Sequence, residues 1–407
     1  MGVPEPSTRA FHWMGVPPSS TYVSGEKNAP GPKNPNQGLE VTTDSQPDRR
    51  RTLRASRRTK TPEKIGISII GCGNHVLGQH LPNLCGLSNA QFRGIASATG
   101  KNATIVREKY KFAFITTDID EVMNDSETDC VLICSSQHEH YNHTRKTIEA
   151  RKAVFVEKPM VTSLDDFQSL YKLMLEKPVL FTLGLNRRYS THVRKLREVI
   201  DGPIDAVTYT VAVPFVPPDH WTLDEFEGGG RLVSEGEHFI DVCHLLIGRP
   251  PVSVYARALG KMTSDIRKLC NFALTIHYDG AIANIVFNES GAKGHPREKV
   301  SVMGRGQVAV IDDFAKLIVH GNRVKKFGYA LQADFGHMQE LREFLAAVQD
   351  KPNAMLTWEE ASAATLCMFA GQESIRTGEA VDLREFKRSL IGEPTSRKDI
   401  ADMGASR

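Results

Sequence analysis

Short apolar runs alternate with polar stretches of helical period from residue 64 to residue 183. The expected strands are residues 65–70, 91–96, 114–116, 130–134, the start of 154–160, and 179–183. One expected helix begins after the turn at residue 73. The others are residues 102–111, 119–124, a segment ending near 150, and 163–176. Strands and helices that alternate in this way form a doubly wound parallel sheet with right-handed crossovers. This part of the chain predicts an α/β domain.

A second pattern follows, in which strands succeed one another without helices between most of them. The expected strands are residues 209–215, 252–258, 270–277, 281–288, 299–303 and 307–311. Such a run predicts an antiparallel sheet. Helices are expected at 234–247, ended by Gly248 and Pro250, at 335–348 and at 358–375, the last with a Thr357/Glu360 capping box. After Arg384 the sequence turns polar, and we expect it to fray.

The length of 407 residues favours two domains, since a domain usually has about 100–200 residues. We expect an N-terminal α/β domain over residues 63–184 and a C-terminal α+β domain with a large, mostly antiparallel open sheet over 185–390. Residues 1–62 are rich in Pro, Gly, Ser, Thr and Asn, and we expect a disordered tail there and a flexible tail over 391–407.

The positive charge of the chain is concentrated near its start. Residues 1–63 contain ten Lys or Arg against six Asp or Glu, whereas the net charge of the whole chain is +3. A basic run of this kind can bind nucleic acid, but a solvated tail is the preferred interpretation, and we expect no nucleic-acid partner. No apolar run is long enough for a membrane span, and no apolar leader is seen, so a cytoplasmic protein with seven free cysteines is expected.

The strand at 65–70 leads into a glycine turn and the start of a helix. Glycines at 71 and 73 permit a tight turn and close approach of the backbone to a pyrophosphate, whose charge the free N–H groups of the helix start can hold. We therefore expect a Rossmann dinucleotide site in which Gly71, Gly73, Asn74 and His75 contact the coenzyme. Val76 occupies the position of the usual third small residue, so a tight turn without a ligand is the alternative.

The end of the second strand bears on the choice of coenzyme. An acidic residue there usually binds the ribose 2′-hydroxyl of NAD. This chain has Ser97 and Thr99 close to Lys101 instead. Hydroxyls near a cation tolerate a 2′-phosphate, so the sequence favours NADP(H) slightly within an overall prediction of NAD(P)(H).

A carboxylate and an amine, Glu157 and Lys158, end the strand within 154–160. Burying such charges costs several kcal/mol unless they are paired or used, and open α/β sheets bind ligands beyond the carboxyl ends of their strands. We therefore place Glu157 and Lys158 at the ligand crevice, with Ser135 and His140 as further coenzyme contacts. Pro159 fixes the backbone after the lysine and admits a cis bond. The spacing of the histidines at 138, 140 and 143 is loose, and we predict no metal site.

Several motifs together resemble the Gfo/Idh/MocA oxidoreductases. They are Gly71-x-Gly73, His140 seventeen residues before Glu157, the Glu157-Lys158-Pro159 triplet, and the segments 184–190, 228–230, 235–241 and 334–337. The resemblance extends from about Lys64 to Arg384. It implies a second domain whose open sheet covers the nicotinamide and often mediates oligomerisation, so we expect a homodimer or homotetramer.

The resemblance also implies roles for individual residues. Lys158 matches the catalytic lysine of the family, and His238 matches the histidine that relays the proton of the substrate hydroxyl. The family commonly has Asp four residues before this histidine, where this chain has Ser234. Either the adjacent Glu235 replaces that Asp, or the proton relay differs. Asp241 lies on the same helical flank as Glu235 and His238 and completes the catalytic candidates.

The resemblance implies a dehydrogenase or reductase for a sugar, cyclitol or related polyol, with hydride transfer to or from NAD(P). Candidate hydroxyl-binding residues are Asn186, Arg188, Asp219, His220 and Trp221. One alternative is an enzyme of the same fold that uses tightly bound NAD for transient oxidation while it cleaves or rearranges a sugar. Another is a dinucleotide-sensing regulator without turnover, which the missing third glycine and Ser234 favour.

Overall fold

The computed structural model describes residues 64–98, 101–224, 227–259, 265, 269–292, 294–328 and 333–392. The predictions for the tail 1–62, for Thr99 and for residues 393–407 lie outside this range. The described residues fall within one unit, residues 56–407. No helix among them is long and apolar enough to cross a membrane.

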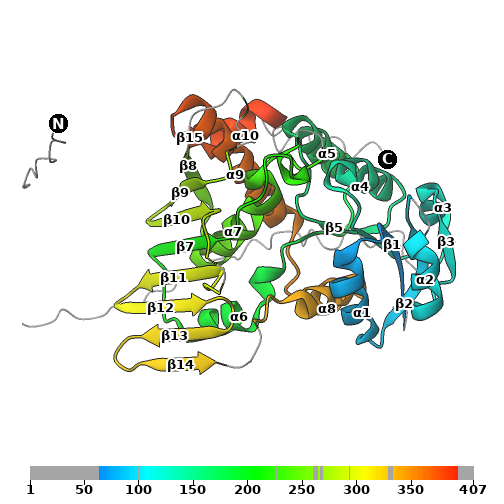
Figure 1. The fold of residues 1–407 in the computed structure, drawn as a ribbon, viewed down its shortest axis with the longest axis horizontal. Coiled ribbons are helices and arrows are strands. Elements are labelled where there is room, and N and C mark those ends of the chain that lie inside the picture. The colour runs from blue at the N-terminus through cyan, green and yellow to red at the C-terminus, as the bar shows by residue number, and fades with distance from the viewer. Residues whose placement is uncertain are drawn as a thin grey trace, which may run out of the picture. The chain divides into compact units, whose positions relative to one another are not determined.

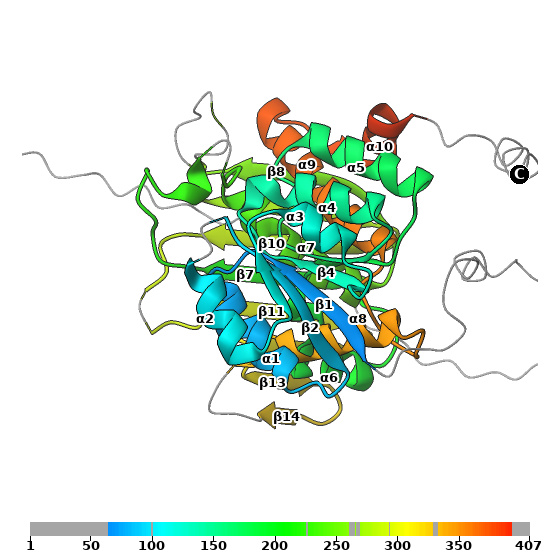
Figure 2. The same cartoon turned by 90° about the vertical axis from the view of Figure 1, so that its right-hand side faces the viewer.

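The first sheet has six strands in the order β3-β2-β1-β4-β5-β6, and all its pairs are parallel (Figures 1 and 2). Every residue of β1 and β4 is buried, as expected for parallel strands covered on both faces. The strands are β1 (Ile65–Ile70), β2 (Ala90–Ala96), β3 (Phe114–Thr116), β4 (Cys130–Ile133), β5 (Ala153–Glu157) and β6 (Phe181–Gly184). The predicted Rossmann-like sheet is confirmed.

Helices connect these strands and cover the sheet. They are a π-helical turn η2 (Val76–His80) continued by α1 (Leu81–Cys85), then α2 (Lys101–Tyr110), α3 (Ile119–Asn124), the short η3 (Gln137–Glu139), α4 (His140–Glu149) and α5 (Leu164–Glu176). The Ser163 side chain caps α5 by accepting from the Asp166 N–H. Each of these crossovers returns the chain to the same sheet edge, so loops that follow the strands gather there.

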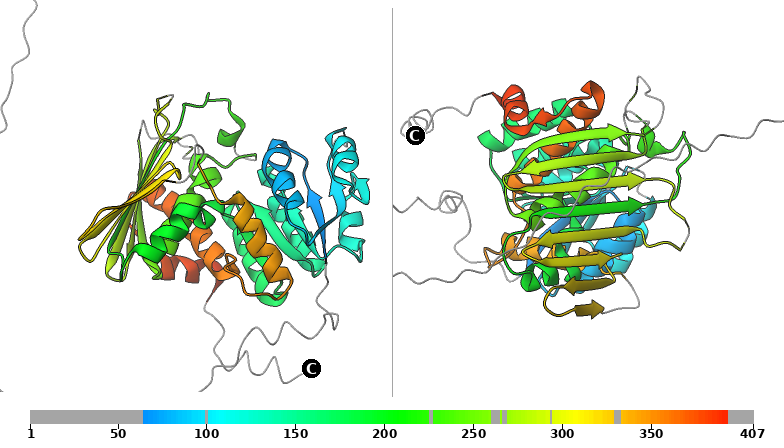
Figure 3. Two further views of the ribbon diagram at one scale, coloured as in Figure 1. Left: turned by 90° about the horizontal axis from the view of Figure 1, so that it is seen from below. Right: turned by 90° about the vertical axis from the view of Figure 1, so that its left-hand side faces the viewer.

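The second sheet has nine strands in the order β14-β13-β12-β11-β7-β10-β9-β8-β15. Only β7 and β10 pair in parallel, so the predicted mostly antiparallel sheet is confirmed. One face is buried under helices and the other is open (Figure 3). The strands are β7 (Ala206–Ala212), β8 (Pro251–Ala258), β9 (Phe272–Tyr278), β10 (Ala281–Asn288), β11 (Glu298–Gly304), β12 (Gln307–Asp312), β13 (Lys316–His320), β14 (Lys325–Gly328) and β15 (Val381–Asp382).

The remaining helices join the two sheets. α7 (Arg231–Ile247) and α9 (Trp358–Thr377) pack together on the covered face of the nine-stranded sheet. α8 (His337–Val348) packs against α1, where Phe344 contacts Phe155 of β5. The predicted capping box at Thr357 and Glu360 is present. Shorter elements are η4 (Asn186–Tyr189), α6 (Thr191–Val199) and η5 (Trp221–Leu223).

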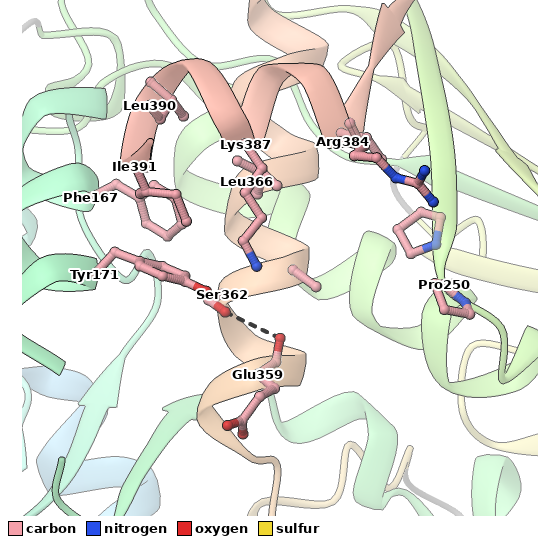
Figure 4. A pocket seen from close by; sticks show the side chains of 13 residues that line it. Phe167, Tyr171, Pro250, Glu359, Ser362, Leu366, Arg384, Lys387, Leu390 and Ile391 are labelled. Carbon is pink, nitrogen blue, oxygen red and sulfur yellow. Dashed lines mark hydrogen bonds between the residues drawn. The ribbon is translucent and has the colours of Figure 1, made fainter. Parts of the chain in front are cut away.

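The expected fraying after Arg384 is wrong, because α10 (Leu383–Ile391) occupies this segment. Asp382 caps the helix by accepting from the N–H groups of residues 384 and 385. Side chains of α10 line a cavity of about 300 Å³ together with residues of α5 and α9 (Figure 4). Lys387 Nζ lies 5.0 Å from the ring centroid of Tyr171. α6, β13, β14 and β15 were also not predicted. The strand expected at 209–215 lies earlier, and Pro214, which has no N–H, follows its end.

Candidate active site

The turn that follows β5 carries Glu157, Lys158 and Pro159 at the carboxyl end of the parallel sheet. β5 pairs with β4 on one side and β6 on the other, so this turn lies away from the sheet edges. The Lys158–Pro159 peptide bond is cis. His140 is buried, and its Nδ1 lies 2.7 Å from the Pro159 carbonyl oxygen. The predicted coenzyme contact His140 therefore supports the backbone of this turn.

Glu157 is anchored by two histidines of the first helical segment. One carboxylate oxygen of Glu157 lies 2.7 Å from His80 Nε2 and 3.2 Å from His75 Nε2. Burial raises the pKa of Glu157, but hydrogen bonds from His75 and His80 outweigh it and hold this pKa well below its usual range. A Cβ at Gly184 of β6 would lie 2.9 Å from the carboxylate, so only glycine leaves room for this cluster.

The same cluster has the donor types that bind transition metals. The ligand atoms of His75, His80 and Glu157 all lie within 4.8 Å of one another, and the ring of His337 is 5.8 Å from that of His75. The sequence did not indicate this grouping, because Glu157 is 77 positions away from His80 in the chain. In the structure these groups hydrogen-bond to one another.

The glycine turn after β1 has the geometry that a dinucleotide needs. Gly71 has φ = +100°, and a Cβ there would lie 2.3 Å from the Cys134 carbonyl oxygen. A Cβ at Gly73 would meet no atom within 4 Å, so the backbone is open at this position. The helical segment that follows begins at Val76, which is fully buried. The residues present therefore fit a coenzyme pyrophosphate even though Val76 replaces a smaller residue.

Lys158 reaches across to α7 on the second sheet. Its Nζ donates a hydrogen bond of 3.0 Å to the Ser234 carbonyl oxygen and lies 4.0 Å from Glu235 Oε2. α7 begins directly after Gly229 and Gly230, which have φ values of +66° and +95°. Residues with side chains rarely adopt this conformation, so the glycines let the helix start close to the turn after β5.

His238 lies one helical turn after Ser234, on the face of α7 that Lys158 approaches. It is buried, and its Nδ1 has no hydrogen-bond partner among the described residues. Burial lowers the pKa of His238 well below the usual value, and the charges of Arg187 and Lys158 lower it further. The imidazole is therefore neutral near pH 7.

The two other catalytic candidates on α7 have different surroundings. Burial raises the pKa of Glu235, but the charges of four cations, Lys158, Arg187, Arg231 and Arg297, outweigh it and lower this pKa. Burial raises the pKa of Asp241 to about 6, and Arg188 Nε at 3.4 Å is its cationic neighbour. Glu235 is thus ionised and lies beside Lys158, whereas Asp241 belongs to a buried pair.

Glu237 is a buried acid that the sequence analysis did not identify. Thr365 Oγ1 on α9 lies 2.6 Å from one of its oxygens, and the Met160 N–H donates to the other at 3.2 Å. Burial raises the pKa of Glu237 to about 7. Thr365 Oγ1 also lies 3.1 Å from the Ala361 carbonyl oxygen, so a protonated Glu237 that donates to Thr365 satisfies both contacts. The partners of Glu237 lie 77 and 128 positions away in the chain, so no local sequence signal identified it.

The family descriptions cover both sheets. "Oxidoreductase family, NAD-binding Rossmann fold" matches residues 65–185, and "Oxidoreductase family, C-terminal alpha/beta domain" matches residues 197–383. This chain belongs to the Gfo/Idh/MocA oxidoreductase family.

Relatives within the Gfo/Idh/MocA family include named dehydrogenases. Myo-inositol 2-dehydrogenase of Thermotoga maritima is 22% identical over 331 residues, which is 78% of this chain and 98% of the relative. The scyllo-inositol 2-dehydrogenase (NADP(+)) IolW of Bacillus subtilis is 28% identical over 59% of this chain and 66% of its own. The structure of levoglucosan dehydrogenase in complex with NADH and levoglucosan has a TM-score of 0.70 at 17% identity, and covers 79% of this chain and 99% of the other.

The predicted substrate-binding residues fall into two groups: those that already have a protein partner and those in the segment before α7. Asn186 Nδ2 donates to the Phe335 carbonyl oxygen, and Arg188 is buried between Asp241 and Glu360, so both already have protein partners. Trp221 is half-exposed in the segment before α7, together with Asp219 and His220. Of the remaining coenzyme candidates, Ser97 follows β2, Asn74 lies in the glycine turn, and Ser135 Oγ lies 2.8 Å from His143 Nδ1. All of these binding roles stay predictions.

The raised pKa of Glu237 makes stability depend on pH. Its pKa in the unfolded chain is near 4.5 and in the fold about 7, so its contribution is present below pH 4.5 and is lost as pH rises through 7. Glu237→Gln should remove this loss. We expect the difference in free energy of unfolding between variant and natural protein to be about 3 kcal/mol more favourable to the variant at pH 8 than at pH 5. Urea unfolding at both pH values measures this. Glu359→Gln, at an exposed position on α9, is the control, and an equal Glu237→Gln effect at both pH values would contradict the prediction.

Proposed function

We propose that this protein is an NAD(P)-dependent dehydrogenase or reductase that acts on a CH–OH group of a sugar, cyclitol or related polyol. The observation that carries the proposal is the hydrogen bond from Lys158 to the α7 backbone one turn before His238. Through this bond an amine that follows the coenzyme sheet contacts the helix of the second sheet that carries His238. The dehydrogenases of inositol isomers and of levoglucosan among its relatives support this substrate class.

The protein must hold the alcohol and move one proton. Bound nicotinamide supplies the hydride acceptor, and the hydroxyl proton of the substrate leaves separately. A neutral imidazole accepts such a proton near pH 7, which fits the lowered pKa of His238. The ammonium of Lys158 stabilises the developing negative charge on the substrate oxygen or passes the proton.

The carboxylates nearby have supporting roles in this proposal. Glu235 lies 4.0 Å from Lys158 and takes the place of the family aspartate at position 234 as its anionic neighbour. Asp241 lies farther along α7 and acts through Arg188, which it helps to hold. Glu157 orients the lysine by fixing the end of β5. Asn186, Arg188, Asp219, His220 and Trp221 remain the candidate hydroxyl contacts.

Two other functions of the same fold make different predictions. An enzyme that oxidises its substrate only transiently retains its NAD through purification and does not exchange it. A regulator binds the coenzyme without turnover. We favour the dehydrogenase because Lys158 contacts the helix that carries His238, whereas a regulator has no need of either residue. We further propose a homodimer or homotetramer, with the open face of the nine-stranded sheet as the contact.

Replacing Lys158 by methionine removes the ammonium and keeps most of the side-chain length. We expect kcat/KM on the best polyol or sugar substrate to fall about 100- to 10,000-fold, since this is the usual contribution of a proton-transfer group. Coenzyme affinity, measured by fluorescence of the reduced form, should change little because the backbone N–H groups of the glycine turn, which would hold the pyrophosphate, are unchanged. Lys172→Met, at an exposed position of α5, is the matched control. Turnover that survives in Lys158→Met would reject the catalytic role.

The choice of coenzyme is tested at the end of β2. We propose NADP(H), because Ser97 directly follows β2 where NAD-specific folds place an acid. Ser97→Asp adds a charge that repels a 2′-phosphate and accepts from a free 2′-hydroxyl. We expect the ratio of kcat/KM for NADP⁺ over NAD⁺ to fall at least about tenfold, as one charged hydrogen bond allows. A natural protein that already prefers NAD⁺ would overturn this proposal.

The cluster of His75, His80 and Glu157 acts, in our proposal, as a hydrogen-bonded anchor and not as a metal site. Each histidine already has a carboxylate partner, so no metal is needed to satisfy these groups. We expect prolonged treatment with a chelator to leave kcat unchanged, and metal analysis of the purified protein to find less than stoichiometric zinc. Loss of activity that zinc restores would show the opposite.

A further inference from the structure

Arg297 is a cation at the site for which the proposed reaction has no use. It immediately precedes β11, and its side chain is 45% exposed. Its guanidinium lies 3.8 Å from Glu235 Oε2 and 3.6 Å from Glu298 Oε1. Among the described residues the Arg297 side chain makes no hydrogen bond, whereas its backbone N–H donates to Asp313. A guanidinium has five N–H donors in a planar fork, so Arg297 presents most of its donors to the surrounding space.

Arg297 and Lys158 face the same small region. The nitrogen of each lies within 4.0 Å of one and the same oxygen of Glu235, and neither is close enough for a hydrogen bond to it. Arg231, at 3.7 Å from the other oxygen, completes the ring of cations. Three cations thus surround the carboxylate of Glu235, and none of them is close enough to donate a hydrogen bond to it.

Most of the charges at this site have a partner within the protein. Arg231 forms an ion pair with the buried Glu289 at 2.8 Å, and Arg187 is paired with Glu298 through two bonds of 2.7 Å. Lys158 donates a hydrogen bond to the Ser234 carbonyl oxygen. The guanidinium of Arg297, in contrast, lies beyond hydrogen-bond distance of both of its carboxylate neighbours, so it can bind the carboxylate of a ligand.

Two buried polar atoms beside these cations also lack partners. Ser234 Oγ and His238 Nδ1 have no hydrogen-bond partner among the described residues, and both residues are more than nine-tenths buried. Ser234 is the residue whose carbonyl oxygen Lys158 contacts. Unsatisfied buried groups are costly and are expected where a ligand completes the network.

From these contacts we infer that the substrate carries a carboxylate, which Arg297 binds while the reacting hydroxyl lies at Lys158 and His238. This inference rests on the proposed function and narrows its substrate to acidic sugars or cyclitols. A guanidinium fork matches a carboxylate in two parallel hydrogen bonds. A phosphate ester matches the same fork, but its nearly double charge exceeds the single charge of Arg297.

Matched substrate pairs test the inference. We expect the full-length protein with NAD(P)⁺ to oxidise glucuronate or galacturonate with a higher kcat/KM than glucose or galactose. Arg297→Gln should lower the ratio of kcat/KM for the acid over the neutral sugar about 10- to 100-fold, mainly through KM, as expected for a hydrogen-bonded charge. Arg323→Gln, at an exposed arginine before β14, should leave the ratio unchanged. The KM for the acid should also rise with salt.

The possible failures are distinguishable. A preference for neutral sugars, or for glucose 6-phosphate over glucuronate, overturns the inference and leaves the proposed function intact. If none of these compounds reduces the coenzyme, the proposed function fails. Calorimetric titration of glucuronate and of glucose into the coenzyme-loaded protein then tests whether Arg297 binds a carboxylate. Binding of glucuronate alone, lost in Arg297→Gln, supports the carboxylate site. Equal binding of both sugars, or none, rejects it.

Discussion

The site depends on how the turn after β5 is held. Different elements hold its residues in place. Glu157 is bound by His75 and by His80 of η2, Lys158 by the Ser234 carbonyl of α7, the Pro159 carbonyl by His140, and the Met160 N–H by Glu237 of α7. These contacts are hydrogen bonds or ion pairs of largely buried groups. Leaving such a donor or acceptor without a partner costs about 1–3 kcal/mol. The position of Lys158 is therefore determined by both sheets together, and the coenzyme turn, the lysine and α7 form one connected network.

That network sets three acids of one helix to different protonation states. Glu235, Glu237 and Asp241 lie within two turns of α7, yet cations hold the pKa of Glu235 low while burial raises that of Glu237 to about 7 and of Asp241 to about 6. Environment and not residue type makes the difference. An ionised Glu235 stabilises the ammonium of Lys158, whereas a protonated Glu237 avoids a second negative charge behind the turn. The pKa of His238 is lowered first by burial and then by the charges of Arg187 and Lys158, so its imidazole is neutral.

The strands and helices of the two sheets could be predicted from the sequence better than the polar contacts between side chains could. Apolar runs such as residues 130–133 are typical of covered strands, and the glycine at 71 predicted a tight turn that its φ value confirms. β14, whose four residues include two lysines, and the two-residue β15 carry almost no pattern, so they were missed. Glu237 and His80 could not be recognised because their partners lie 77 or more residues away in the chain. Which polar groups meet is decided by packing that a linear pattern does not contain.

The incomplete glycine fingerprint has a structural explanation in the π-helical turn that follows it. Leu81 N–H bonds to the Val76 carbonyl five residues earlier, so this turn holds one residue more than an α-helical turn. The wider turn lets Val76 be fully buried in the position where a small residue usually permits close packing. It also ends at His80, whose ring then reaches Glu157 at 2.7 Å. The buried valine at position 76 and the contact of His80 with the lysine-bearing strand thus belong to the same π-helical turn.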